Sequence, residues 1–418
     1  MPQPSRPVSA LRRQGPALAL MYGAQGLPAG LAFNAYATIL RASGASLEHI
    51  GLAGLVFLPW ALKFLWAGAI DNAGKRFGYG KLALYIHLFA VCVCVGMAFF
   101  APGPYFLPSL IGILFLNTLF ATQDIVTNAA AVSYLQGRNA GAANAIQVVA
   151  FLLGMLAGGG GGLLVYAHYG WAGVMLGMAA TLFVLWVALL PLRQSVEPKR
   201  QACAAPSRWK DFLTQRGFFW ALLSSLIFKF SGSALAILMQ PFLIDHTVAV
   251  STLGTLQMSN LFWNAVGGAC IGAPLVKHFG SRRAVPILAA PSVLLLGTLW
   301  ALGATGWLST TTLYWGLGCE SLWDGAFYVA LWAMLMNWSS AKRPGMDYSF
   351  LQCGESAANV AAACLVTPVA AAMGYAHTFL GIWLVGVALL GVQLLAAQKL
   401  KGLCCDDTPY PTTHISPQ

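Results

Sequence analysis

The chain has 418 residues, of which 58% are hydrophobic and only 8% are charged, whereas soluble proteins carry about 25% charged residues. This composition excludes a soluble globular protein and predicts an all-α membrane protein, because each crossing of a bilayer needs about 20 apolar residues. The net charge of +11 does not indicate a nucleic acid partner, since it follows from the way in which short basic loops orient membrane proteins.

About twelve apolar segments are expected to cross the membrane. In chain order they are 16–40, 50–70, 82–100, 107–134, 140–167, 171–191, 218–244, 250–275, 285–304, 310–337, 348–374 and 376–398. The first segment lacks a small-residue cleavage site, so we expect it to be retained as a helix. The predicted organisation is an N-terminal six-helix half (1–191), a basic cytoplasmic linker (192–217), a C-terminal six-helix half (218–398) and a cytoplasmic tail (399–418).

Lysines and arginines gather in alternate loops. Arg12 and Arg13 precede the first segment, Lys75 and Arg76 follow the second, and the linker is also basic. Short loops rich in these residues stay in the cytoplasm, so both termini are predicted to be cytoplasmic. The nine cysteines show no metal-binding spacing, and we expect no disulfide, no metal site and no cofactor.

An internal repeat relates the two halves. Phe77-Gly78 after the second segment matches Phe279-Gly280 after the eighth, and Asp124 in the fourth segment matches Asp324 in the tenth. The separations, 202 and 200 positions, are nearly equal. Two parallel six-helix repeats are typical of the major facilitator fold, which holds its binding site near the membrane midplane.

Ionisable side chains inside apolar segments are costly, by about 2.5–3.5 kcal/mol on insertion scales, and are therefore functional candidates. The set is Lys63, Asp124, Lys229, Glu320, Asp324 and Glu355. We expect the four carboxylates to line a cavity and couple protons; Glu320 and Asp324, one helical turn apart, share a face, so that one can be protonated near neutral pH. Lys229 is predicted to attract an anionic part of a substrate. The alternative is that these groups are buried ion pairs, for instance Lys63 with Asp71 or Asp124.

Polar and aromatic side chains near these charges are candidate substrate contacts. They are Tyr22, Gln25, Gln123, Asn128, Trp323, Phe327 and Tyr328. Aromatic walls with few polar groups suit a partly apolar solute, although aromatic residues of membrane helices often face lipid. A second set is predicted to serve gating or structure at the basic loops: Lys63, Asp71, Lys75, Arg76, Arg282 and Arg283. Positive-inside topology alone explains the basic residues there, but it does not explain Asp71.

Three stretches resemble the AmpG-like branch of the major facilitators: LPWALKFLWA at 58–67 ending in Asp71, GLP at 26–28, and ATQDI at 121–125. That branch includes muropeptide permeases, acetyl-CoA transporters and the RhtX/FptX-type siderophore permeases. Muropeptide permeases usually have a second aspartate where this chain has Asn128. Their seventh helix carries Tyr-Lys-x-Gly-Asp, whereas this chain reads FKFSG at 228–232, and they are usually longer.

The short form, and GMDY at 345–348, are more similar to the siderophore permeases. This resemblance implies proton-driven import of a ferric siderophore, of the pyochelin kind, across a bacterial inner membrane by a monomer, with iron present only in the cargo. An outer-membrane siderophore receptor would be the functional partner. The alternatives are a muropeptide permease or another amphiphile transporter, a non-transporting sensor, and a membrane-embedded transferase. An enzyme is not expected, because the seven histidines are dispersed rather than clustered with a nucleophile or a metal site.

Overall fold

A computed structural model of the chain describes residues 7–44, 52–198, 206–228, 230–245, 250–305 and 309–406. These residues are largely helical, and no strand occurs among them. By their contacts they form two compact units. Unit 1 comprises Met1–Leu135, Ala143–Leu213 and Ser340–Val360, and unit 2 comprises Gln136–Ala142, Thr214–Ser339 and Ala361–Gln418. The candidate substrate contact Lys229 lies outside the described residues.

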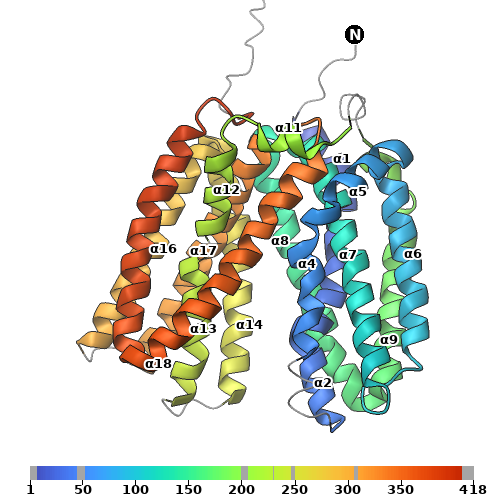
Figure 1. Ribbon diagram of the computed structural model, residues 1–418, viewed down its shortest axis with the longest axis horizontal. Coiled ribbons are helices and arrows are strands. Elements are labelled where there is room, and N and C mark those ends of the chain that lie inside the picture. Colours follow the sequence, from blue (N-terminus) through green and yellow to red (C-terminus); the bar gives the residue numbers. More distant parts are fainter. Residues whose placement is uncertain are drawn as a thin grey trace, which may run out of the picture. The chain divides into compact units, whose positions relative to one another are not determined.

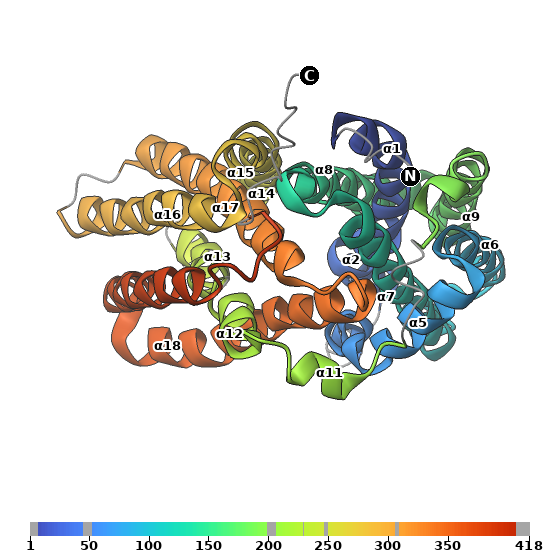
Figure 2. The ribbon, with the colours of Figure 1, turned by 90° about the horizontal axis from the view of Figure 1, so that it is seen from above.

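Unit 1 is a bundle of long helices (Figure 1). Its elements are α1 (Pro7–Gly30), η1 (Leu31–Ala35), α2 (Tyr36–Ala42), η2 (Ala53–Phe57), α4 (Leu58–Leu62), α5 (Phe64–Phe77), α6 (Tyr79–Met97), α7 (Phe106–Leu135), most of α8 (Ala140–Leu156), η4 (Ala157–Gly161), α9 (Gly162–Leu189), η5 (Arg193–Val196) and α11 (Trp209–Leu213). Helix α6 packs against both α7 and α9, and α1 packs against α7 (Figure 2). The run labelled α9 bends at Gly170, whose φ is 64°.

Helix α1 approaches α8 closely enough to require glycine. A Cβ atom at Gly26 would lie 2.2 Å from the carbonyl oxygen of Phe151, and one at Gly158 would lie 1.9 Å from the carbonyl oxygen of Leu27. Small residues are the usual means by which membrane helices make such contacts. This contact fixes α1 beside the buried polar residues of α7.

Unit 2 contains η3 (Gly137–Asn139), α12 (Phe218–Ile227), α13 (Phe230–Asp245), α14 (Val250–Gly267), η6 (Gly268–Gly272), α15 (Ala273–Phe279), α16 (Ser281–Ala304), α17 (Thr310–Trp338) and the part of α18 (Pro344–Lys399) that follows Val360. Helix α17 packs against both α14 and α16. The run α18 bends at Gly374, whose φ is 76°.

With the bends at Gly170 and Gly374 taken as boundaries, the described residues contain six long helical segments before residue 191 and six after residue 217, as the repeat predicted. Six of the described helical stretches are, by length and composition alone, long and apolar enough to cross a membrane.

The repeat extends to the turns. Gly78 and Gly280 both have positive φ, 98° and 83°, and each is followed by a helix whose first backbone N–H groups bind a carboxylate from a later segment. In unit 1 that carboxylate belongs to Glu197, which accepts from the N–H groups of Tyr79 and Lys81. Partial burial raises the pKa of Glu197, although the charge of Lys81 acts in the opposite direction. In unit 2 it is Asp406, which accepts from the N–H of Ser281 at 2.5 Å.

Several predicted helix boundaries were wrong. The first segment does not begin at residue 16, because α1 begins at Pro7 and contains Arg12 and Arg13. The second segment does not end at residue 70, because α5 continues to Phe77 and places Asp71, Lys75 and Arg76 on its last two turns. The ninth begins at Ser281 rather than at 285, so Arg282 and Arg283 belong to α16. Hydropathy detects only the apolar part of a helix, whereas lysine, arginine and alanine continue a helix beyond it until a glycine of positive φ ends it.

Candidate functional site

Asp124 lies on α7 in unit 1 with only 3% of its surface exposed. Its carboxylate forms an ion pair with the ammonium of Lys63, the residue between α4 and α5. Asn128, one turn further along α7, donates a hydrogen bond from Nδ2 to Asp124 Oδ2 at 2.9 Å. A cation and an amide therefore both bind the same carboxylate oxygen, Asp124 Oδ2.

The first part of α18 completes this arrangement within unit 1. Gln352 Oε1 accepts from Lys63 Nζ at 2.8 Å and from Asn128 Nδ2 at 2.7 Å. Ser349 Oγ lies 3.3 Å from the same Asn128 nitrogen. We refer to Tyr22, Lys63, Asp124, Asn128, Ser349 and Gln352 as the Asp124 cluster.

Helix α1 contributes Tyr22, whose hydroxyl donates to Asn128 Oδ1 at 3.0 Å. Two glutamines flank the cluster: Gln25 Nε2 donates to Thr127 Oγ1 at 2.8 Å, and Gln123 Nε2 donates to the carbonyl oxygen of Met21 at 3.0 Å. The Oε1 atoms of both glutamines are buried without a hydrogen-bond partner among the described residues. They are acceptors that a polar solute or water can use.

The Asp124 cluster has no net charge as long as the ion pair is intact. Removing one partner of a buried pair leaves an uncompensated charge and typically costs about 3–5 kcal/mol. The arrangement can therefore act in two ways: its amides and hydroxyls can bind polar groups of a solute, and protonation of Asp124 can release Lys63.

In unit 2, Asp324 on α17 lines a cavity of about 40 Å³ together with Phe228, Phe327 and Gln393. Asn264 Nδ2, on α14, donates to Asp324 Oδ2 at 3.1 Å. The ring of Phe228 makes edge contacts with Phe327, Tyr328 and Trp332, at centroid distances of 6.2, 5.9 and 5.6 Å. Aromatic side chains thus form one wall of this carboxylate's surroundings.

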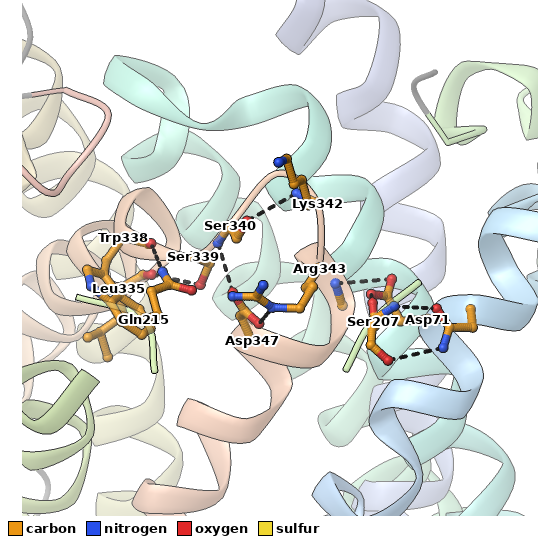
Figure 3. Close-up of polar contacts among 12 residues, drawn as sticks. Asp71, Ser207, Gln215, Leu335, Trp338, Ser339, Ser340, Lys342, Arg343 and Asp347 are labelled. Atoms are coloured by element: carbon orange, nitrogen blue, oxygen red, sulfur yellow. Dashed lines mark hydrogen bonds and ion pairs between the residues drawn. The ribbon is translucent and has the colours of Figure 1, made fainter. Parts of the chain in front are cut away.

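A third group of charges gathers at the basic end of unit 1 (Figure 3). Asp71 accepts from the Tyr79 hydroxyl at 3.0 Å, from Ser207 Oγ at 2.5 Å and from the backbone N–H of Gly345 at 3.3 Å. Lys75 Nζ lies 3.4 Å from Asp71 and donates to Ser207 Oγ at 2.7 Å. Asp71 and Lys75 therefore tie the linker and the start of α18 to the end of α5.

The start of α18 is also stabilised locally. Lys75 Nζ donates to the carbonyl oxygen of Lys342 at 2.6 Å. Arg343 Nε donates to Asp347 Oδ1 at 3.0 Å, and Asp347 Oδ2 accepts from the backbone N–H of Ser340 at 3.0 Å (Figure 3). Burial raises the pKa of Asp347 to about 6, although Arg343 acts in the opposite direction.

The structure brings together Tyr22, Lys63, Asp124 and Asn128, and separately places Asp324 near Phe327. The other predicted residues are placed as follows. On α17, Glu320 is buried but does not line the cavity, and Trp323 is partly exposed. Glu355 lies in the part of α18 that belongs to unit 1. Arg76, over the Phe77 ring, and Arg283 are exposed.

Sequence reasoning missed Ser207, Ser349, Gln352 and Gln393. Gln352 and Gln393 could have been predicted from the sequence, because each is a polar residue with hydrogen-bonding capacity inside an apolar segment. The two serines could not, since serine is common both in loops and in membrane helices.

Comparisons with known proteins agree with this architecture. A model of the Major Facilitator Superfamily matches residues 18–319. The anhydromuropeptide permease of Escherichia coli (strain K12) is 28% identical over 400 residues, which cover 89% of this chain and 76% of the permease. The putative transporter AmpG 2 of Rickettsia typhi is 25% identical over 250 residues, covering 57% of this chain and 60% of that protein.

Solved structures agree as well. The proton:xylose symporter XylE aligns with a TM-score of 0.68 at 10% sequence identity, covering 94% of this chain and 95% of the symporter. At this identity the likeness concerns the fold alone, and it confirms the predicted all-α major facilitator fold. The AmpG-like resemblance is supported by these two relatives, whereas the siderophore sub-branch is not confirmed by them.

Proposed function

The chain belongs to the Major Facilitator Superfamily, and on this premise we propose that it imports an anhydromuropeptide or a closely similar cell-wall fragment, driven by the proton gradient. Its relatives and structural neighbours are transporters, which indicates a multi-pass membrane transporter rather than an enzyme. The similarity to the Escherichia coli permease over most of the chain favours this substrate over a ferric siderophore.

The observation that carries the proposal is the Asp124 cluster. Its amide, hydroxyl and carboxylate groups are of the kind that bind sugars and peptides, and the buried Oε1 atoms of Gln25 and Gln123 have no partner among the described residues. In unit 2 the aromatic side chains around Phe228 offer an apolar surface, which suits the faces of sugar rings. A solute with both polar and apolar parts matches these two kinds of surface.

The proposed coupling uses the predicted carboxylates. Asp124 exchanges a proton when its ion pair with Lys63 opens, and Asp324 exchanges one beside its cavity. Glu320 and Glu355 are secondary candidates, and Lys229 is proposed to attract the acidic groups of the solute. Transport proceeds by alternating access.

We further propose that the protein resides in a bacterial inner membrane as a monomer, with no cofactor and no nucleic acid partner. The orientation follows from the lysines and arginines of the alternate loops, which place both termini in the cytoplasm. The Asp71 contacts then lie at the cytoplasmic end.

The test is uptake in cells that lack their own anhydromuropeptide permease. Cells with and without this gene receive a radiolabelled anhydromuropeptide or a panel of radiolabelled ferric siderophores, each with and without an uncoupler. Gene-dependent, uncoupler-sensitive accumulation of the anhydromuropeptide supports the proposal. Accumulation of a siderophore alone, or of neither solute at normal expression, contradicts it.

Import of a ferric siderophore is the second candidate, and Asn128 favours it. The resemblance places a second aspartate at this position in muropeptide permeases, whereas here Asn128 donates to Asp124 and Gln352 through the amide nitrogen that an aspartate lacks. With an aspartate, the cluster would carry one more negative charge. The neutral cluster is compatible with an anionic ferric chelate, and an outer-membrane siderophore receptor would then supply the substrate.

A further inference from the structure

Gln393, in the last part of α18, is a buried polar side chain whose hydrogen-bonding groups find no protein partner. Only 3% of its surface is exposed, and neither Nε2 nor Oε1 has a hydrogen-bond partner among the described residues. Leaving such a group unsatisfied destabilises the folded protein, because the group has lost its hydrogen bonds to water. A buried carboxamide of this kind usually binds something other than protein.

The cavity of about 40 Å³ in unit 2 supplies the space. Gln393 lines it together with Asp324 and Ser231, whereas the remaining lining residues, Phe228 and Phe327 among them, are apolar or glycine. A buried water needs about 10–15 Å³ and two to four polar partners, so this cavity has room for about three or four waters.

We propose that this cavity is a hydration site in which ordered water bridges the carboxamide of Gln393 to the carboxylate of Asp324. Gln393 acts as a positioning residue: its Nε2 and Oε1 hold the water, and the water donates to Asp324 and provides a path for its proton. The role in coupling rests on the proposed function, whereas the hydration itself does not.

The lining favours water over a metal cation. Hard cations such as Ca²⁺ and Mg²⁺ take about six or more oxygen ligands. The side-chain oxygens that line the cavity come only from Ser231, Asp324 and Gln393 among the described residues. Water also uses the donor Nε2 of Gln393, which would repel a cation. The site therefore matches a ligand that both donates and accepts hydrogen bonds.

The first test is structural and independent of transport. The full-length protein in lipid nanodiscs is imaged by cryo-electron microscopy at a resolution that shows ordered water, as wild type, Gln393→Leu and the matched control Gln14→Leu. Gln14 is another buried glutamine, on α1 in unit 1. We expect water density between Gln393 and Asp324 in the wild type and the control, and its loss in Gln393→Leu. A dry cavity in the wild type overturns the proposal.

The same samples test the cation alternative. Thermal unfolding is measured in sodium chloride and in choline chloride at equal ionic strength. We expect equal midpoints for the wild type in both salts. A midpoint that is higher in sodium for the wild type, but not for Gln393→Leu, would assign the cavity to a cation and overturn the hydration site.

The second test concerns coupling. In proteoliposomes, Gln393→Leu is expected to lower proton-driven accumulation about tenfold, the effect of losing a hydrogen-bonding group beside a charge. Solute counterflow, which needs no net proton movement, should stay near the wild-type rate, and Gln393→Asn should restore accumulation. Equal losses of accumulation and counterflow contradict the positioning role. Absence of proton-driven accumulation in the wild type contradicts the proposed function, and the water density still decides the hydration site.

Discussion

Asp124 and Asp324 occupy equivalent positions in the two repeats, but the described contacts of the two carboxylates differ. Asp124 in unit 1 forms an ion pair with Lys63, the residue between α4 and α5, whereas Asp324 in unit 2 accepts a hydrogen bond from the amide of Asn264. Lys63 and Asn264 are themselves separated by 201 positions, close to the offset of the repeat. The same scaffold position thus carries a carboxylate paired with a lysine in one unit and a carboxylate that lines a cavity in the other.

We expect the two carboxylates to respond differently to substitution. A carboxylate held by a buried ion pair contributes to structural specificity and is costly to disturb. A carboxylate that lines a cavity has space beside it, so a change of its side chain disturbs the surrounding packing less. We therefore expect substitutions at Asp124 to affect folding as well as transport, and substitutions at Asp324 to affect chiefly transport.

The largest expected effect tests the ion pair in unit 1. Lys63→Met leaves Asp124 buried without its cation and should lower the free energy of unfolding by about 3–5 kcal/mol. The measurement is unfolding in mixed detergent micelles. Adding Asp124→Asn to the same chain should recover much of the loss, because the uncompensated charge is gone. Equal stability of Lys63→Met and the wild type would show that the two carboxylates are not held differently.

The next effect concerns Asp324. Asp324→Asn should lower proton-driven accumulation about 100-fold, the size typical of losing a group that transfers a proton, while the midpoint of thermal unfolding changes little. Accumulation is measured in proteoliposomes with an imposed pH gradient, and counterflow serves as the control for folding and binding. Unchanged accumulation and unchanged uncoupler sensitivity in this variant would remove Asp324 from the coupling mechanism.

The comparison extends to the basic ends of the units. Asp71 has Ala273 at the equivalent position, 202 residues on, so only unit 1 has this acid. Asp71→Asn should weaken the contacts to Ser207 and Gly345 by about 1.5–3 kcal/mol, the usual contribution of hydrogen bonds to a charged group. Hydrogen–deuterium exchange at residues 340–347 should accelerate, whereas Arg76→Gln, at an exposed position on the same helix, should leave it unchanged.

The smallest effect is the pH dependence caused by Asp347. Its folded-state pKa of about 6 lies above the ordinary value of 3.8, so the folded state binds its proton more tightly than the unfolded state does. Stability should therefore fall as the pH rises through the window from about 4 to about 6, by at most about 1.4 kcal/mol per pH unit. Thermal unfolding at several pH values measures this slope, and Asp347→Asn should flatten it. If the stability of the wild type instead increased with pH in this window, and that of Asp347→Asn did not, the raised pKa of Asp347 would be contradicted.

Much of the fold was predictable because the bilayer imposes a strong constraint. Apolar segments of about 20 residues and the repeated Phe-Gly turns at Gly78 and Gly280 predicted two sets of six helices. The helix ends were less predictable, as Asp71 and Arg282 show, since a helix continues into polar sequence for as long as the residues favour it.

The candidate site was predictable only in part. Asp124, Lys63 and Asp324 were found because a charge in an apolar segment is rare. Gln352 and Gln393 are uncharged and stand far along the chain from their partners, and Ser207 belongs to a linker whose path hydropathy does not describe. Their roles depend on contacts between residues that are more than 60 positions apart.

By itself, the sequence determined that the chain is an all-helical membrane protein built from two repeats with an acidic residue at the same position in each, because composition and spacing are properties of the chain alone. Only the tertiary structure decided which neighbour each acid meets: Lys63 for Asp124, and Asn264 and a cavity for Asp324. The reason is physical, since the charge state of a buried group depends on its surroundings in space.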